Sequence, residues 1–303
     1  MISRYVWLDG RYVPTSKAVV PITTHAIHYG TSAFEGIRAY WNGKNLHVFR
    51  LDEHIARFRR SGTYYDMVLD RTDSEMRAAI TGICRKNAIK KSCYIRPFYF
   101  VGEHGISLHV TKKAPIRTAV FVFPMGRLFE KTGISACVVS WKKFSDESTP
   151  VQAKMGGNYL NSIIATGEAK KAGADEAILL DYSGNVSEAP GENIFVVRNG
   201  RLFTPSLDSS ALDGITRDTV TSIAGDLDIP VEERPVPRSE MMAADEIFLT
   251  GTAAEITPVT IVDGKKIGDG RPGDVTKKLV SEYADIVMGK NKGYMHWLTG
   301  VYT

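Results

Sequence analysis

Short strand-like runs alternate with helix-like runs along both halves of this 303-residue chain. Residues 5–8 and 12–13 flank an Asp-Gly pair, and residues 193–197 and 201–204 flank Asn-Gly, which is typical of β-hairpins. Between these hairpins lie longer runs with apolar residues at helical spacing. Alternation of this kind packs helices onto sheets, so we predict an α/β (α+β) class with two layers per domain.

The same periodicities place the other elements. Further strands are expected at 94–101, 116–124, 134–141, 175–181 and 247–250, and helices at 52–65, 73–88, 158–173, 213–228 and 273–288. We expect Asp73 to cap the second of these helices, with Met76, Ile80 and Ile83 facing inward. The length favours two domains, a smaller one at 1–124 and a larger one at 134–303, joined by a glycine-containing linker at 125–133.

Composition excludes several classes of function. The net charge of +4 is mild and its positive residues are interleaved with acids, so we expect no nucleic-acid or membrane partner. Three scattered cysteines without a Cys-x-x-Cys pair favour reduced thiols, as in the cytoplasm. The first residues lack the pattern of a signal peptide, which agrees with a cytoplasmic location.

Two stretches of the first half carry candidate functional residues. The segment 25–40 contains His25 and His28, which we interpret as packed, hydrogen-bonded imidazoles, since a metal site would need a third ligand nearby. In the strand at 94–101, Tyr94 and Arg96 share one face and Ile95 lies on the other. From spacing alone, Arg96 faces either a pocket or solvent.

The segment Ala153-Lys154-Met155-Gly156-Gly157 stands just before a helix with Leu160, Ile163 and Ile164 at helical spacing. Two glycines there allow a tight turn and a close approach to another group. Lys154 is therefore at a junction, where a desolvated amine can act as a Schiff-base nucleophile. The alternative is an ordinary exposed lysine ahead of a helix.

Two further stretches are candidate anion sites. Gly214-Ile215-Thr216 leads into a helix, whose free N–H groups and dipole favour phosphate. Gly251-Thr252-Ala253 follows a buried strand and offers a hydroxyl and unhindered amides. The Gly268-Asp269-Gly270 stretch reads as a turn, and no Gly-Lys-Ser loop is present, so a small phosphorylated cofactor is favoured over a nucleotide. Phosphate, an imine-forming amine and a buried acid together specify pyridoxal phosphate, with Glu188 and Tyr159 as candidates for contacting its ring.

Six blocks in order along the chain resemble the branched-chain amino acid aminotransferases, which are fold-type IV pyridoxal phosphate enzymes with the fold of D-amino acid aminotransferase. The blocks are residues 28–38, 94–97, 153–159, 187–193, 214–218 and 251–258.

The resemblance implies a role for each matching residue. Lys154 would bind the cofactor aldehyde and then shuttle the substrate proton, Glu188 would pair with the pyridine nitrogen, and Tyr159 would contact the ring hydroxyl. The implied phosphate ligands are Arg57, Ile215, Thr216 and Thr252. The implied substrate-binding residues are Phe34, Tyr29 and Tyr159 as apolar walls, Tyr94 with the amides of Thr252 and Ala253 at the α-carboxylate, Arg96 with Tyr29 at the distal carboxylate of glutamate, and Arg38.

The implied reaction moves the amino group between leucine, isoleucine or valine and 2-oxoglutarate, as in branched-chain amino acid biosynthesis, in a homodimer or a dimer-based hexamer. One pocket must then accept both an aliphatic chain and a carboxylate, which needs an arginine at its edge. Met125 and Leu128 replace the aromatic residues of many relatives, and the loop 104–110 also diverges, so side-chain preference stays open.

Other functions on the same fold remain as alternatives. These are a D-amino acid or (R)-amine transaminase, an aminodeoxychorismate lyase, and a pyridoxal phosphate carrier without catalysis. The Tyr94-x-Arg96 strand favours a transaminase over the lyase. Retention of both Lys154 and Glu188 argues against a carrier, which has no use for an electron sink.

Overall fold

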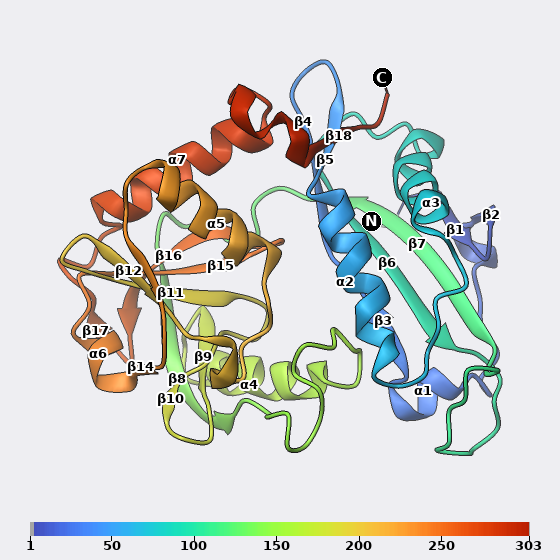
Figure 1. Ribbon diagram of the computed structural model, residues 1–303, viewed down its shortest axis with the longest axis horizontal. Coiled ribbons are helices and arrows are strands. Elements are labelled where there is room, and N and C mark those ends of the chain that lie inside the picture. Colours follow the sequence, from blue (N-terminus) through green and yellow to red (C-terminus); the bar gives the residue numbers. More distant parts are fainter. Residues whose placement is uncertain (1–2, 303) are drawn as a thin grey trace. The chain divides into compact units, whose positions relative to one another are not determined.

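The computed structural model describes residues 3–302 as a mixed α/β chain (Figure 1). Its α-helices are α1 (His25–Tyr29), α2 (Leu51–Thr63), α3 (Asp73–Lys86), α4 (Tyr159–Lys171), α5 (Ile215–Asp226), α6 (Arg238–Met242) and α7 (Asp274–Val287). Its strands are β1 (Tyr5–Leu8), β2 (Arg11–Pro14), β3 (Ser32–Phe34), β4 (Ile37–Trp41), β5 (Leu46–Phe49), β6 (Cys93–Val101), β7 (Ile116–Pro124), β8 (Ile134–Lys142), β9 (Glu176–Leu180), β10 (Asn185–Val186), β11 (Asn193–Arg198), β12 (Arg201–Thr204), β13 (Val231–Glu233), β14 (Val236–Pro237), β15 (Glu246–Gly251), β16 (Glu255–Val262), β17 (Lys265–Lys266) and β18 (Leu298–Gly300).

The described chain forms two compact units. The first contains residues 3–126, 153–157 and 285–302, and the second contains Arg127–Gln152 and Asn158–Ala284. The chain therefore leaves the first unit within the expected linker at 125–133 but re-enters it for five residues around Lys154. By its contacts this lysine groups with the first unit, whereas the sequence places it in the span expected for the second domain.

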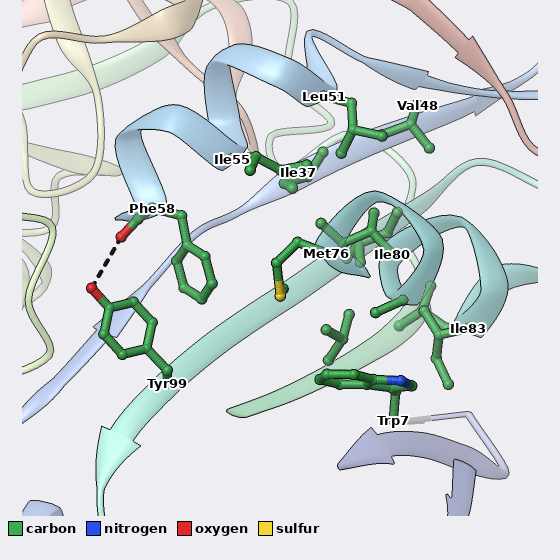
Figure 2. Packing of buried hydrophobic residues seen from close by; sticks show 14 of the residues in the cluster. Trp7, Ile37, Val48, Leu51, Ile55, Phe58, Met76, Ile80, Ile83 and Tyr99 are labelled. Atoms are coloured by element: carbon green, nitrogen blue, oxygen red, sulfur yellow. Dashed lines mark hydrogen bonds between the residues drawn. The ribbon is translucent and has the colours of Figure 1, made fainter. Parts of the chain in front are cut away.

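The first unit is an antiparallel sheet in the order β18-β5-β4-β6-β7-β1-β2, with β3 paired to β6. Helices α2 and α3 lie on one face of this sheet and bury its main apolar core (Figure 2). Met76, Ile80 and Ile83 of α3 point into that core, as predicted. The Tyr99 hydroxyl donates a hydrogen bond to the Phe58 carbonyl at 3.2 Å, which joins β6 to α2.

Strand β6 presents different side chains on its two faces because successive residues point to opposite sides. Ile95 and Tyr99 belong to the core under the helices, whereas Tyr94 and Arg96 contact each other on the other face. The prediction that Tyr94 and Arg96 share a face is confirmed.

The second unit contains a mixed sheet in the order β13-β12-β11-β15-β16-β8-β9-β10-β14, with β17 paired to β16. The predicted hairpin of β11 and β12 is confirmed, and Asn199 and Gly200 both have positive φ, as its turn requires. Strand β8 pairs in parallel with both β9 and β16.

Helix α4 packs on β8 and β9 of the second unit through small residues. Ala165 and Ala169 are fully buried against Val139 and Leu179. By contrast, Leu160 and Ile163, two of the apolar residues at helical spacing, are 67% and 64% exposed. The periodicity therefore predicted the helix correctly, but the face that packs on the sheet is the one with alanine.

The start of α3 differs from the prediction by one residue. Thr72, not Asp73, is the N-cap: the Thr72 hydroxyl accepts from the Glu75 N–H, and the Glu75 carboxylate accepts from the Thr72 N–H. This is a capping box, which satisfies two backbone groups at once and so outcompetes a cap at Asp73. Within residues 3–302, every helix is too short or too polar to cross a lipid bilayer.

Candidate active site

In the first unit, the segment around Lys154 lies alongside β3 like an added strand. The Phe34 N–H donates to the Lys154 carbonyl at 3.1 Å, and the Gly156 N–H donates to the Ser32 carbonyl at 2.7 Å. From α2, the Ser61 hydroxyl accepts from the Lys154 N–H at 3.0 Å. The backbone that carries Lys154 is thus fixed on both sides by residues about a hundred positions earlier.

Glycines make this pairing possible. Gly30 has a φ of +67°, and a Cβ added to it would lie 2.9 Å from the Gly157 Cα. The Gly157 N–H donates to the Gly30 carbonyl at 3.1 Å. The close approach expected of Gly156-Gly157 is confirmed, and the approaching group is the backbone before β3.

The Lys154 amine lies in an unusual electrostatic environment. Its Nζ is 5.2 Å from the centre of the Phe34 ring. Burial and the nearby Arg57 guanidinium lower the pKa of Lys154 to about 8, and Glu35 partly opposes this shift. Near neutral pH a useful fraction of this amine is uncharged, which is the form that attacks a carbonyl.

Arg96 lies between two aromatic side chains. Its guanidinium carbon is 4.5 Å from the Phe34 ring centre, and its Nη2 donates to the Tyr94 hydroxyl at 2.8 Å. Its Nε is buried, and no hydrogen-bond acceptor within residues 3–302 reaches it. Of the two alternatives left by spacing, this environment favours the pocket over solvent, because a buried donor without an acceptor is ready for a ligand oxygen.

Arg57 is buried on α2 and makes two hydrogen bonds to Glu35. Its Nε and Nη2 donate to the Glu35 carboxylate at 2.6 and 2.9 Å, and the His54 Nδ1 lies 2.8 Å from the same carboxylate. Burial raises the pKa of Glu35, but the charge of Arg57 and the hydrogen bonds from Arg57 and His54 hold it well below its usual range. Sequence reasoning assigned no role to Glu35 or His54. The position of a carboxylate between Phe34 and Gly36, in an otherwise uncharged stretch, was the signal that could have indicated Glu35.

The other two candidates of the first unit are hydrogen-bonded to backbone carbonyls of connecting segments. The Arg38 Nη1 donates to the Gly126 carbonyl at 2.7 Å, so Arg38 holds the chain where it leaves this unit. The Tyr29 ring packs on His25, and its hydroxyl donates to the Ile106 carbonyl at 3.2 Å, in the loop 104–110.

The two histidines at the start of α1 behave differently. His25 is buried and hydrogen-bonded through both ring nitrogens, to Thr31 and to the Ser107 carbonyl, as predicted. His28 is exposed, so the expectation of packing is wrong for it, although its Nε2 lies 3.0 Å from the Ile22 carbonyl. No group of three or more potential metal ligands occurs among residues 3–302.

In the second unit, Glu188 is buried and surrounded by donors. Its carboxylate lies 2.5 Å from the Lys143 ammonium and accepts from the Leu212 N–H at 2.9 Å and from the Asn193 amide at 3.1 Å. Sequence reasoning missed Lys143, because a lysine just after a strand looks like any exposed basic residue. A buried carboxyl group is costly unless donors surround it, and these three contacts supply them.

Asn193 connects Glu188 to the start of α5. Its amide nitrogen donates to both Glu188 and the Leu212 carbonyl, and a Cβ at Gly214 would lie 1.8 Å from its side-chain oxygen. Only glycine fits at that position, which is the N-cap of α5. The helix therefore begins at Ile215, as the anion-site prediction requires, with Thr216 in its first turn.

The remaining candidates of the second unit lie on elements tied to the Glu188 loop. Thr252 and Ala253 form the turn between β15 and β16, and a Cβ at the preceding Gly251 would lie 3.1 Å from the Gly191 carbonyl. Tyr159 begins α4, whose Ser162 hydroxyl donates to the Pro190 carbonyl at 2.7 Å. The structure thus gathers the acid, the two candidate anion-site turns and Tyr159 around one loop.

The chain resembles known proteins over nearly its whole length. Residues 32–262 match the family described as amino-transferase class IV. A probable branched-chain-amino-acid aminotransferase of Aquifex aeolicus is 41% identical over 302 residues, which cover 98% of this chain and 97% of that protein.

Solved structures give the same result for the fold. The branched-chain aminotransferase of Thermoproteus uzoniensis with norvaline is 45% identical and superposes with a TM-score of 0.96, covering 99% of this chain and 100% of that one. The branched-chain amino acid aminotransferase of Thermobaculum terrenum, in its PLP form, is 36% identical with a TM-score of 0.94, covering 100% of this chain and 99% of that one. The expected fold-type IV architecture is confirmed.

Proposed function

Because the chain belongs to the amino-transferase class IV family, we propose that it is a branched-chain amino acid transaminase. It transfers the amino group of leucine, isoleucine or valine to 2-oxoglutarate in two successive half-reactions and releases glutamate. The observation that carries this choice of substrates is the stacking of Arg96 on Phe34. An apolar ring beside a cation accepts an aliphatic chain in one half-reaction and a carboxylate in the other.

Pyridoxal 5'-phosphate is the cofactor that these residues fit. The first unit offers an amine with a lowered pKa and a buried arginine, and the second offers a buried acid and a helix start where only glycine is tolerated. When bound, the cofactor supplies an aldehyde that captures amines and a ring that withdraws electrons. We assign Arg57, Ile215, Thr216 and Thr252 to its phosphate, Glu188 to its pyridine nitrogen, and Tyr159 to its ring hydroxyl.

Lys154 has two tasks in this proposal. Its uncharged amine first holds the cofactor covalently, and after displacement by the substrate the same Nζ carries a proton from the substrate α-carbon. The pKa of about 8 suits both tasks, since the group can gain and lose a proton near neutral pH. The backbone hydrogen bonds from Ser61 and Phe34 keep its position constant while the side chain moves.

The substrate is bound by both of its ends. We assign Tyr94 and the amides of Thr252 and Ala253 to the α-carboxylate, and Arg96 to the distal carboxylate of glutamate. The buried Arg96 Nε gives that carboxylate a donor beside the one already used by Tyr94. Further substrate contacts are proposed for Phe34, Tyr29, Tyr159 and Arg38.

We also propose that the enzyme works in the cytoplasm as a homodimer or a dimer-based hexamer. Ile106 and Leu108, in the loop 104–110, are 83% and 78% exposed, which is costly unless another surface covers them. Two of the three cysteines are buried thiols, which agrees with a reducing compartment. Light scattering after size exclusion would measure the mass, and a monomer would contradict the assembly.

A substrate panel tests the function. The purified enzyme with pyridoxal phosphate is mixed with 2-oxoglutarate and one amine donor, and glutamate formation is measured. L-leucine, L-isoleucine and L-valine should be far better donors than D-alanine or 1-phenylethylamine of (R) configuration. Preference for a D-amino acid or the (R)-amine would replace the assignment with the corresponding transaminase, and no glutamate with any donor would refute a transaminase.

A further inference from the structure

Helix α2 carries a stripe of buried polar residues. His54, Arg57 and Ser61 follow one another at spacings of three and four, so they share one face of the helix. All three are almost fully buried. Ser61 binds the backbone of Lys154, and His54 and Arg57 both contact Glu35. Burying polar groups costs free energy unless they are hydrogen-bonded, and each of these three side chains has such a partner.

Glu35 is the centre of this arrangement. It is 0% exposed, and both of its oxygens accept charged or polar hydrogen bonds. Its own N–H donates to the Pro97 carbonyl at 2.9 Å, which fixes it between β3 and β6. Burial lowers the pKa of His54 despite the opposing charge of Glu35, so His54 acts as a neutral Nδ1–H donor near neutral pH.

The contact with Glu35 fixes the orientation of the Arg57 guanidinium. Glu35 takes the Nε and Nη2 edge of the guanidinium in a two-point contact. Such a contact fixes the plane of the guanidinium as well as its distance. The Nη1 edge must then point away from Glu35, so an anion held by Arg57 meets that opposite edge.

We propose that Glu35 is a positioning residue that aims Arg57 at the phosphate of the cofactor, with His54 holding the carboxylate in place. The inference rests on the proposed function, which assigns Arg57 to that phosphate. It makes Glu35 responsible for the part that Arg57 plays in the preference of this enzyme for a phosphorylated cofactor. Without Glu35, the long Arg57 side chain loses its fixed orientation and the phosphate gains little from it.

Two ligands that differ only in the phosphate separate this role from a general structural one. Full-length protein freed of cofactor is titrated with pyridoxal 5'-phosphate and, separately, with pyridoxal, and binding is followed by absorbance of the bound ligand. In Glu35→Ala we expect the dissociation constant for pyridoxal phosphate to rise about tenfold or more, as for a lost charged hydrogen bond. The dissociation constant for pyridoxal should change less than about twofold.

Glu53→Ala is the matched control. Glu53 lies on α2, the helix that carries Arg57, and its carboxylate pairs with Arg50 at 2.5 Å, but its side chain is 40% exposed. We expect both dissociation constants to stay at the wild-type values. In the double variant of Glu35→Ala and Arg57→Ala, the ratio of the dissociation constants for pyridoxal and pyridoxal phosphate should equal the ratio in Arg57→Ala alone. The reason is that Glu35 acts through Arg57.

The possible results distinguish failure of this inference from failure of the proposed function. Equal weakening of both ligands in Glu35→Ala, or additive losses in the double variant, would overturn the inference and leave the proposed function standing. If wild type binds neither ligand, the proposed function fails together with the inference. If Glu35→Ala does not fold, Glu35→Gln keeps the shape and carries the test: the preference for the phosphorylated ligand must fall, and an unchanged preference overturns the inference.

Discussion

The Ser61 hydroxyl accepts a hydrogen bond from the Lys154 N–H at 3.0 Å across 93 residues of sequence. The same hydroxyl donates to the Arg57 carbonyl at 2.9 Å, one turn earlier in α2. A single buried side chain therefore connects the helix that carries Arg57 to the backbone that carries the reactive amine. Both residues belong to the first unit, so this part of the site is held by one core.

Removal of the Ser61 hydroxyl should destabilise the protein. Ser61→Ala leaves the Lys154 N–H without its acceptor, and a buried unsatisfied donor costs about 1–3 kcal/mol. Urea unfolding of the full chain measures the change in the free energy of unfolding. Thr63→Ala is the control: this exposed hydroxyl also donates to a carbonyl of its own helix, and its loss should cost less than about 0.5 kcal/mol. Equal costs for the two variants would contradict the prediction.

The lowered pKa of Lys154 predicts how capture of the cofactor depends on pH. Only the uncharged amine attacks the aldehyde, so the rate of capture should rise with pH and level off above a midpoint of about 8. For an ordinary lysine, the rate would keep rising until about pH 10.5. Stopped-flow absorbance after mixing cofactor-free protein with pyridoxal phosphate measures this rate. Lys154→Ala should show no such phase, and a midpoint near that of free lysine would refute the stated environment.

Loss of Arg96 should harm one half-reaction more than the other. Arg96→Gln removes the charged donor proposed for the distal carboxylate of glutamate, so kcat/KM for glutamate should fall roughly 10- to 100-fold. Leucine has no distal charge, and its value should change only a few-fold. Arg117→Gln, on the neighbouring strand β7 with a partly exposed pair to Asp9, is the control. Equal losses for both amino acids would argue against this role.

The pair of Lys143 and Glu188 should matter for stability. Both side chains are almost fully buried, so Lys143→Met leaves a buried carboxylate without its counter-charge and should cost about 3 kcal/mol. The exposed lysine of the pair between Lys131 and Asp175 offers a comparison, and Lys131→Met should cost less than about 1 kcal/mol. Thermal unfolding at neutral pH measures both, and a harmless Lys143→Met would show that the acid is satisfied by Asn193 and Leu212 alone.

Local patterns predicted much of the fold because they depend on neighbours in sequence. Alternation along β6 placed Tyr94 and Arg96 on one face, and the helix expected at 213–228 is found as α5, which begins directly after Gly214. One error concerned the start of a helix. Thr72 caps α3 instead of Asp73, because the Glu75 carboxylate accepts a hydrogen bond from the Thr72 N–H. The exposed Leu160 shows that helical spacing predicts a helix, but not which face the sheet will cover.

The sequence by itself determined most of the longer elements, the family and the residues that match its motifs, because these depend on the order of side chains along the chain. The partners of buried charges were decided only by the tertiary structure. Glu35 meets Arg57 and His54 of α2, and Glu188 meets Lys143, which follows β8 and is 45 residues earlier in the sequence. A buried charge must find a counter-charge or a donor when water is removed, and only packing brings such distant residues together.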